Sequence, residues 1–267
     1  MIPNILTIAG SDCSGGAGIQ ADIKSISANG GYAMSVITAL TAQNTRGVTG
    51  VHLCPTDFIA AQIKAIHDDI RLDAVKIGML GDAAITQTVA GAISDLDCPV
   101  VLDPVMVAKG GDRLLQQSAV SALRGFLAQV TVITPNLPEA ADLLDCSEAK
   151  TLDDMREQAQ ALRALGPKAV LLKGGHLSGP ESPDLLVTDD GETWLESARI
   201  ETKNTHGTGC TYASALATWL GAGLSLPEAA AHAKSYITAA ITHADELSVG
   251  AGHGPVHHFY SLQGRPT

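Results

Sequence analysis

The stretch that decides the fold is NTHGTGCT, residues 204–211, which leads from a strand-like segment at residues 199–203 into an apolar helix pattern at residues 213–220. Gly207 and Gly209 let the backbone turn sharply and approach a ligand closely. The first N–H groups of a helix have no intrahelical acceptors and carry partial positive charge. The stretch therefore predicts a phosphate site at a helix start. A glycine-rich turn beside a buried cysteine is the alternative.

Strand-length apolar runs alternate with helix-period patterns on both sides of this stretch. The alternation predicts one α/β domain over residues 1–267, with a mostly parallel sheet covered by helices on both faces. Residues 48–53 are expected to form a small antiparallel flap, and residues 185–188 and 193–196 an antiparallel pair at the edge. The other predicted strands are residues 5–9, 34–41, 74–77, 100–102, 130–134 and 169–172, and the other predicted helices are residues 19–26, 58–70, 85–96, 114–127, 155–165 and 227–243.

Composition excludes several classes of protein. The 267 residues are 45% hydrophobic, which supplies a sizeable core, and carry a net charge of -11, which repels nucleic-acid phosphates. The five cysteines are scattered and show no CxxC, so reduced thiols and a cytoplasmic location are expected. No apolar run is long enough to span a membrane. A small phosphate-bearing ligand stays possible, because a helix start can bind an anion locally.

Polar and glycine-rich residues follow several of the predicted strands. They are the loop at residues 10–18, Gln43, Asp103, Asn136 with Glu139, and Lys173. Ligands of open α/β sheets bind beyond the carboxyl ends of the strands, so these residues are expected to share one site. The first loop is not GxGxxG, and no GxxxxGK[ST] occurs, so neither common nucleotide motif explains it.

An ordered series of motifs carries a resemblance that covers nearly the whole chain. The motifs are GSDCSGGAGIQAD, MSVITALTAQNT, KIGMLG, VVLDPVMVAKGGD, ITPNLPEA, VLLKGGH, NTHGTGCT and GHGPVHHF. The series is very similar to the hydroxymethylpyrimidine/phosphomethylpyrimidine kinases of thiamine biosynthesis, in the ribokinase superfamily. Cys13 and Gly110 depart from the family pattern, in which proline and serine are expected.

The resemblance implies a ribokinase-like fold and an enzyme that uses ATP and Mg²⁺. The implied reaction phosphorylates the hydroxyl of 4-amino-5-hydroxymethyl-2-methylpyrimidine, and then the phosphate of that product to give a diphosphate. A homodimer is also implied. A pyridoxal kinase of the same superfamily is the nearest alternative, since it would share the ATP half of the site.

The resemblance assigns the phosphoryl-transfer end of the site to residues 207–210. Cys210 aligns with the usual aspartate base of the superfamily, and a helix start lowers the pKa of a thiol, so a thiolate base is expected. Gly207, Thr208 and Gly209 are expected to hold the transferring phosphoryl group through N–H donors. The plainer alternatives are that Cys210 only packs near the substrate and that Thr208 is the N-cap of the helix.

The remaining candidates divide between the nucleotide and the metal. Asp103 and Glu139 supply the oxygen ligands that Mg²⁺ prefers, although each alone is more often a cap or a solvated helix residue. The ATP phosphates are assigned to Lys173, Asn136, Thr208 and Lys109, the last in a loop that could serve as a lid. The alternative is that Lys109 is a solvated lysine with no contact to the phosphates.

Gln43 is the candidate for reading the pyrimidine, because its amide offers both an acceptor and a donor. Asp22 is expected to accept from the substrate, with a solvated helix position as its alternative. Gly10, Ala17 and Met79 are expected to line the pocket, although Met79 also suits a core position.

Histidine and cysteine suggest other chemistry that fits less well. His206 beside Cys210 raises the possibility of a thiol hydrolase that needs no ATP, but the phosphate-type glycine loop makes this the weaker reading. The tail histidines His253, His257 and His258 lack an accompanying cluster of carboxylates or cysteines, so a structural role or packing near a subunit interface is expected. A silent ligand-binding protein is disfavoured because metal, phosphate and base candidates are all present.

Overall fold

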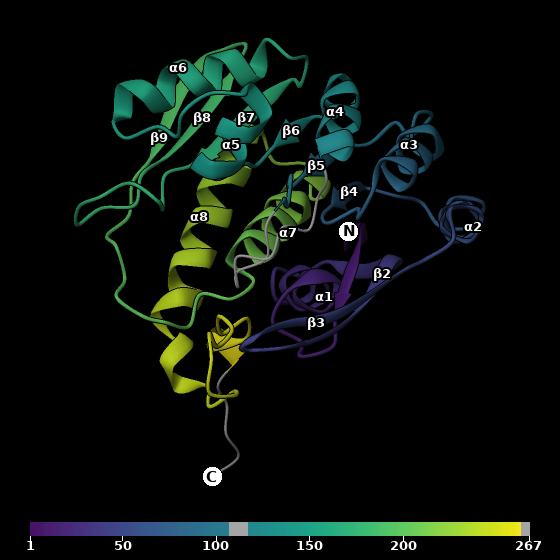
Figure 1. Cartoon of the computed structure of the whole chain (residues 1–267), viewed down its shortest axis with the longest axis horizontal. Helices are drawn as coiled ribbons and strands as arrows, with labels where there is room; N and C mark the ends of the chain where they lie inside the picture. Colours follow the sequence, from purple (N-terminus) through teal and green to yellow (C-terminus); the bar gives the residue numbers. More distant parts are fainter. Residues whose placement is uncertain (107–116, 263–267) are drawn as a thin grey trace.

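The computed structural model describes residues 1–106 and 117–262. Its strands form one sheet in the order β3-β2-β1-β4-β5-β6-β7-β8-β9 (Figure 1). The strands from β2 to β7 are parallel, while β3, β8 and β9 pair antiparallel at the two edges. Their bounds are β1 Asn4–Asp12, β2 Tyr32–Asn44, β3 Gly47–Leu53, β4 Ala74–Ile77, β5 Val100–Leu102, β6 Val132–Ile133, β7 Ala169–Lys173, β8 Asp184–Thr188 and β9 Gly191–Leu195.

Helices cover both faces of the sheet, as Figure 1 shows. One face carries α1 (Gly18–Ala28), α7 (Thr208–Gly221) and α8 (Leu226–Thr242). The other carries α2 (Thr56–His67), α3 (Ala83–Ala92), α4 (Gln117–Phe126), α5 (Leu137–Leu144) and α6 (Leu152–Arg163). Short 3-10 turns lie at Leu127–Gln129, Ala244–Glu246 and Tyr260–Leu262. This arrangement confirms the predicted mostly parallel sheet with antiparallel edges.

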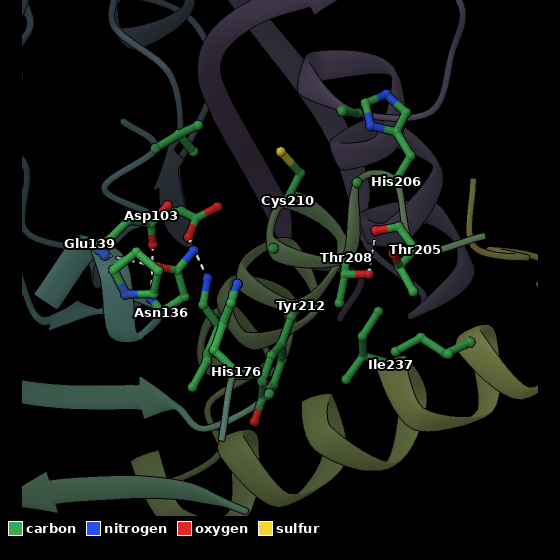
Figure 2. Close-up of a pocket in the computed structure, with 18 of the residues that line it drawn as sticks. Asp103, Asn136, Glu139, His176, Thr205, His206, Thr208, Cys210, Tyr212 and Ile237 are labelled. Atoms are coloured by element: carbon green, nitrogen blue, oxygen red, sulfur yellow. Dashed lines mark hydrogen bonds and ion pairs between the residues drawn. The ribbon is translucent and has the colours of Figure 1, made fainter. Parts of the chain in front are cut away.

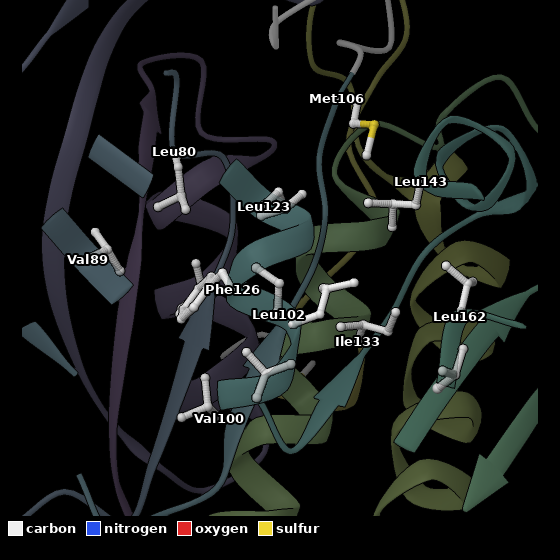
Figure 3. Packing of buried hydrophobic residues seen from close by; sticks show 14 of the residues in the cluster. Leu80, Val89, Val100, Leu102, Met106, Leu123, Phe126, Ile133, Leu143 and Leu162 are labelled. Atoms are coloured by element: carbon white, nitrogen blue, oxygen red, sulfur yellow. The ribbon is translucent and has the colours of Figure 1, made fainter. Parts of the chain in front are cut away.

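Each parallel strand sends alternate side chains to the two faces, so the core has two layers. Leu102 and Ile133 pack with Phe126 and Leu143 beneath α3 to α6 (Figure 3). On the opposite face, residues such as Val101 pack against the small side chains of α7 and α8. Alanine dominates that layer, and small residues let α7 lie close to the strands. With aromatics at only 3% of the chain, aliphatic residues fill most of both layers.

One predicted strand is wrong. Residues 199–203 form no strand, and the pairing that the described residues show beside them is an isolated bridge between Glu181 and Ala198. The reason lies in Arg199, whose guanidinium donates to the carbonyl oxygens of Gly175, Leu177, Gly179 and Glu181. The segment is therefore fixed to the loop after β7 by the Arg199 side chain and by one backbone bond from the Arg199 N–H to the Pro180 carbonyl at 2.8 Å, and not by a ladder of backbone bonds.

Most other errors concern element ends. Strand β6 is limited to Val132–Ile133, and α2 stops at His67, before Ile70. The predicted helix at residues 114–127 begins outside the described residues. No helix in the described parts of the chain is long and apolar enough to cross a bilayer.

Candidate active site

A cavity of about 680 Å³ lies at the carboxyl ends of the central strands and at the start of α7 (Figure 2). Asp22 does not line it, and Lys109 lies outside the described residues. All the other predicted site residues line its walls: Gly10, Ala17, Gln43, Met79, Asp103, Asn136, Glu139, Lys173, Gly207, Thr208, Gly209 and Cys210. The fold therefore brings together residues that the sequence placed at the ends of different strands. Their roles stay predictions.

The start of α7 is open toward the cavity. Gly207 is the N-cap, with a left-handed φ of 77°, and no side chain caps the helix. The alternative in which Thr208 is the N-cap is therefore wrong, since Thr208 is the first helical residue and its hydroxyl donates to the Thr205 carbonyl at 2.7 Å. The Thr208 N–H donates to the Thr205 carbonyl at 3.4 Å, but no side chain caps the helix start, so the N–H groups that follow face an anion site without a side-chain acceptor.

Asp12 holds the two glycine-rich loops together. Its carboxylate accepts hydrogen bonds from the Ser14 hydroxyl at 2.7 Å and from the N–H groups of Ser14, Gly16 and Ala17. His206 Nε2 lies 2.8 Å from Asp12 Oδ2. Burial alone would raise the pKa of Asp12, but the hydrogen bonds from His206 and Ser14 outweigh it and lower the pKa to about 2. Asp12 is therefore an ionised acceptor at neutral pH.

Lys173 and Asp103 form an ion pair beside the helix start. Lys173 Nζ lies 2.9 Å from Asp103 Oδ1, which also accepts from the Thr134 hydroxyl at 3.1 Å. A Cβ on Gly209 would lie 3.2 Å from Asp103 Oδ2 and 3.3 Å from Lys173 Nζ. The missing side chain at Gly209 thus lets the helix start approach both charges, an arrangement suited to a phosphate and its counter-ion.

Glu139 belongs to the capping box of α5. Its Oε2 accepts from the Asn136 N–H at 2.8 Å, and Asn136 Oδ1 accepts from the Glu139 N–H at 2.8 Å. Burial raises the pKa of Glu139 to about 7, against the opposing effect of Lys173. Ionising a buried carboxylate costs free energy, and a bound cation would offset that cost. Glu139 is therefore suited to contact a cation.

The oxygen ligands offered by Asp103 and Glu139 suit Mg²⁺ bound together with phosphates and water better than a metal ion bound by protein side chains alone. Among the described residues, no group of three or more His, Cys, Asp or Glu side chains could hold a metal ion. Mg²⁺ commonly keeps several waters and is bound by one or two carboxylates together with substrate phosphates. Asp103 and Glu139 match that pattern, and Figure 2 shows both beside Asn136 on one side of Cys210.

Cys210 lies in the cavity wall with a protonated thiol. Burial raises its pKa to about 11, and the nearby Lys76 ammonium only partly opposes this effect. The pKa of Cys210 is therefore raised and not lowered as expected, because desolvation of the thiolate outweighs the Lys76 ammonium and the hydrogen bond from Gly18. A base role for Cys210 therefore depends on the thiolate form, whose fraction grows as pH rises toward the pKa of the thiol.

Asp22 is neither solvated nor in the cavity wall. Its carboxylate lies 2.9 Å from Lys76 Nζ and accepts from the hydroxyls of Thr7 at 2.6 Å and Ser214 at 2.8 Å. Ser214 and Cys210 are four residues apart and share one face of α7. Asp22 and Lys76 therefore support the floor beneath Cys210 from inside the protein.

Cys13 makes two hydrogen bonds that the proline expected at this position would not make. Cys13 Sγ accepts from the Gln43 N–H at 3.3 Å and donates to the Gln43 carbonyl at 3.2 Å. Proline has no side-chain group for either bond. The thiol therefore fixes the backbone that carries Gln43.

The apolar end of the cavity was missed by sequence reasoning. Ile237 and Ile241 of α8 line it, with Tyr212 of α7 beside Ile237 in Figure 2. Lys234 Nζ lies 2.7 Å from Asp184 Oδ2, and both side chains are nearly buried. Periodicity assigned these isoleucines to the core, and the only available signal was a lysine within an apolar helix face.

The tail histidines are structural. His258 Nε2 lies 2.9 Å from the Thr211 hydroxyl, and burial lowers its pKa to about 3. His253 Nδ1 lies 3.2 Å from the Lys203 carbonyl. His206 is likewise committed to Asp12, so its Nε2 is not positioned as a base for Cys210. These contacts favour the structural reading over a metal site or a thiol hydrolase.

The comparison with known families decides the identity. The sequence profile described as phosphomethylpyrimidine kinase matches residues 12–257. The chain belongs to the phosphomethylpyrimidine kinase family. The hydroxymethylpyrimidine/phosphomethylpyrimidine kinase of Escherichia coli is 53% identical over 260 residues, which cover 97% of this chain and 98% of that protein. The kinase of the same description from Rhizobium meliloti is 48% identical over 256 residues, or 96% of each chain.

Solved structures resemble this kinase along nearly its full length. An ADP complex of Bacillus subtilis pyridoxal kinase has a TM-score of 0.90 at 40% identity, and covers 98% of this chain and 100% of that one. A Clostridium difficile phosphomethylpyrimidine kinase has a TM-score of 0.79 at 41% identity, and covers 90% and 99% of the two chains. The fold is therefore ribokinase-like, as predicted, but is shared by kinases of two different substrates.

Proposed function

We propose that this kinase transfers a phosphoryl group from ATP to the hydroxyl of 4-amino-5-hydroxymethyl-2-methylpyrimidine, and then to the phosphate of that product. The observation that carries the proposal is the 53% identity to the Escherichia coli hydroxymethylpyrimidine/phosphomethylpyrimidine kinase across nearly all of both chains. The cavity supports it, because Gln43 lies in the same cavity as Cys210 and the open start of α7. The diphosphate product serves thiamine diphosphate biosynthesis.

The phosphoryl group would lie between the start of α7 and the Asp103–Lys173 pair. The N–H groups at Gly207, Thr208 and Gly209 would stabilise its developing charge, with Lys173 and Asn136 at the ATP phosphates. Asp103 and Glu139 would hold Mg²⁺, which neutralises phosphate charge when bound. Cys210 would take the proton of the substrate hydroxyl. Lys109 remains a predicted ATP contact.

The apolar end of the cavity is proposed to take the nucleotide base. Ile237, Ile241 and Tyr212 offer apolar surface there, and Asp103, Asn136 and Glu139 lie on the other side of Tyr212 from Ile237 in Figure 2. The structural relative from Bacillus subtilis was solved as an ADP complex, which supports a nucleotide in this kinase. Loss of ADP affinity in Ile237→Asp, without loss of pyrimidine binding, would support this placement.

The assembly is proposed to be a homodimer, working in the cytoplasm as a single kinase domain. Strand β3 pairs only with β2 within the described residues. Leu40, Val51 and Leu53 expose much of their side chains there, as does Phe58 on α2. Sedimentation of the native protein and of a Val51→Lys variant tests this proposal, since a monomeric variant and a dimeric native protein are expected.

Product analysis by mass after incubation with Mg-ATP and the hydroxymethylpyrimidine tests the main proposal. Appearance of the monophosphate and then of the diphosphate is expected. Absence of both would refute the function, and monophosphate alone would refute the second step.

A pyridoxal kinase is the second candidate, because the TM-score of 0.90 belongs to a pyridoxal kinase. Coupled measurement of ADP release with each alcohol separates the two candidates. A strong preference for pyridoxal over the pyrimidine would replace the main proposal.

A further inference from the structure

The amide of Gln43 lies between two groups whose hydrogens can be assigned. Gln43 Nε2 is placed 3.5 Å from His206 Nε2, and Gln43 Oε1 lies 3.0 Å from the Thr41 hydroxyl oxygen. The two ends of an amide have the same shape, so the surrounding donors and acceptors decide which end is oxygen. Both neighbours of Gln43 therefore bear on its orientation.

The first neighbour, His206, is a donor at Nε2. Asp12 Oδ2 lies 2.8 Å from this nitrogen, and the Asp12 carboxylate also accepts from Ser14, Gly16 and Ala17. An ionised carboxylate only accepts, so His206 Nε2 carries the hydrogen. An amide nitrogen facing it would place two donors against each other.

The second neighbour, Thr41, has one hydroxyl hydrogen. Its oxygen lies 2.7 Å from the Ser11 carbonyl oxygen, nearer than the 3.0 Å to Gln43 Oε1. The backbone carbonyl can only accept, so it takes the hydrogen and leaves Thr41 as an acceptor toward Gln43. An amide oxygen there would place two acceptors against each other.

We infer that Asp12, His206 and Thr41 hold the Gln43 amide with its oxygen toward His206 and its nitrogen toward Thr41. Exchanging the two ends removes both conflicts at once. One N–H then donates to Thr41, while the second N–H and an oxygen lone pair are left for a ligand. His206 and Thr41 are therefore positioning residues that set the order of donor and acceptor in the pocket.

This order fixes which way the substrate ring faces, and the inference at this step rests on the proposed function. In the pyrimidine, the 4-amino donor is adjacent to a ring-nitrogen acceptor, and the 5-hydroxymethyl group is adjacent to the amino group. Pairing with the amide places the amino group on the His206 side. The hydroxymethyl group is then on that side too, beside Gly207 and the start of α7. The opposite amide orientation would turn the reacting hydroxyl away.

Two pairs of variants test the inference. His206→Phe removes the donor while His206→Gln retains one, and Thr41→Val removes the acceptor while Thr41→Ser retains it. The probes are the aminopyrimidine alcohol and 5-hydroxymethyl-2-methylpyrimidine, which lacks only the amino group. The kcat/KM for the aminopyrimidine, divided by the kcat/KM for the probe without the amino group, should fall about tenfold in His206→Phe and Thr41→Val. This is the effect of about one hydrogen bond. His206→Gln and Thr41→Ser should keep most of the ratio.

Binding calorimetry without nucleotide provides a readout that does not depend on turnover, and melting temperatures show that each variant is folded. The Kd of the probe without the amino group, divided by the Kd of the aminopyrimidine, should fall in parallel. His258→Gln is the matched control, since His258 is buried but does not line the cavity, and it should keep the native ratio.

An unchanged ratio in folded His206→Phe and Thr41→Val would overturn the inference, as would equal losses in Phe and Gln variants. If the native protein binds the aminopyrimidine but does not phosphorylate it, the proposed function fails. The calorimetric ratio then still decides the orientation of Gln43.

Discussion

The Lys76 ammonium lies 2.9 Å from both carboxylate oxygens of Asp22, and neither side chain is exposed to solvent. The pair joins β4 to α1, and the Ser214 hydroxyl extends it to α7. Burial alone would lower the pKa of Lys76, but Asp22 outweighs burial and raises it. The charges therefore persist inside the protein, directly below the part of α7 that carries Cys210.

Asp22→Ala should destabilise the protein by about 3–5 kcal/mol, because it leaves the Lys76 ammonium buried without its counter-ion. The double variant Asp22→Leu, Lys76→Met should recover much of that loss, since it removes both charges together. Thermal and urea unfolding measure both effects. If Asp22→Ala is as stable as the native protein but raises the KM for the pyrimidine, Asp22 contacts substrate as the sequence suggested.

Cys210→Ala tests the proposed base. The raised pKa of about 11 means that the thiolate fraction grows throughout the range from pH 7 to 10. If the thiolate is the base, kcat should rise with pH in the native enzyme, and the variant should lose this rise together with about 10²–10⁴-fold in rate. Cys146→Ala, at an exposed position, is the matched control. Near-normal turnover with unchanged pH dependence in Cys210→Ala would contradict the base role.

Substitution of the two glycines at the start of α7 should affect different properties, stability for Gly207 and turnover for Gly209. Gly207 has a left-handed φ of 77° and faces the Gly16 carbonyl, so Gly207→Ala should lose at least about 1 kcal/mol of folding free energy. At Gly209 the nearest atoms to an added Cβ are the ends of the Asp103 and Lys173 side chains, at 3.2 Å and 3.3 Å. Gly209→Ala should therefore fold normally but displace this pair and lose about 10²-fold in kcat. Equal losses of stability in the two variants would mean that Gly209 matters only for the helix start.

Glu139→Gln should change the pH dependence of stability in the absence of metal and nucleotide. The pKa of Glu139 is raised from 4.5 to about 7 in the folded protein, mainly by burial. Its contribution to stability is therefore complete below about pH 4.5 and is lost as pH rises through 7. Glu139→Gln should flatten the melting temperature across this window, because the amide stays neutral.

The same variant should raise the Mg²⁺ concentration needed for half-maximal turnover by at least about tenfold, if Glu139 holds the metal. Glu148→Gln, at an exposed position, is the control. A steeper melting profile in Glu139→Gln would contradict the assigned pKa. An unchanged Mg²⁺ requirement would remove Glu139 from the metal site.

The accuracy of the sequence predictions differs between backbone and side chains. The strand–helix alternation located most elements, because burial of one face leaves a period in the sequence. Residues 199–203 failed because an apolar–polar alternation cannot show that Arg199 would satisfy four carbonyls of a distant loop. Thr208 failed as an N-cap because Gly207 had the conformation that the turn required.

By itself, the sequence determined the sheet architecture, the family, and the strand ends at which the site forms. These follow from local periodicity and from motifs whose residues are close in the chain. Only the tertiary structure decided that Asp22 faces Lys76 and that burial raises the pKa of Cys210. The same holds for the contact of Asp12 with His206, 194 residues away. The physical reason is that burial and electrostatic energies depend on which distant side chains share a space, and no local pattern records that.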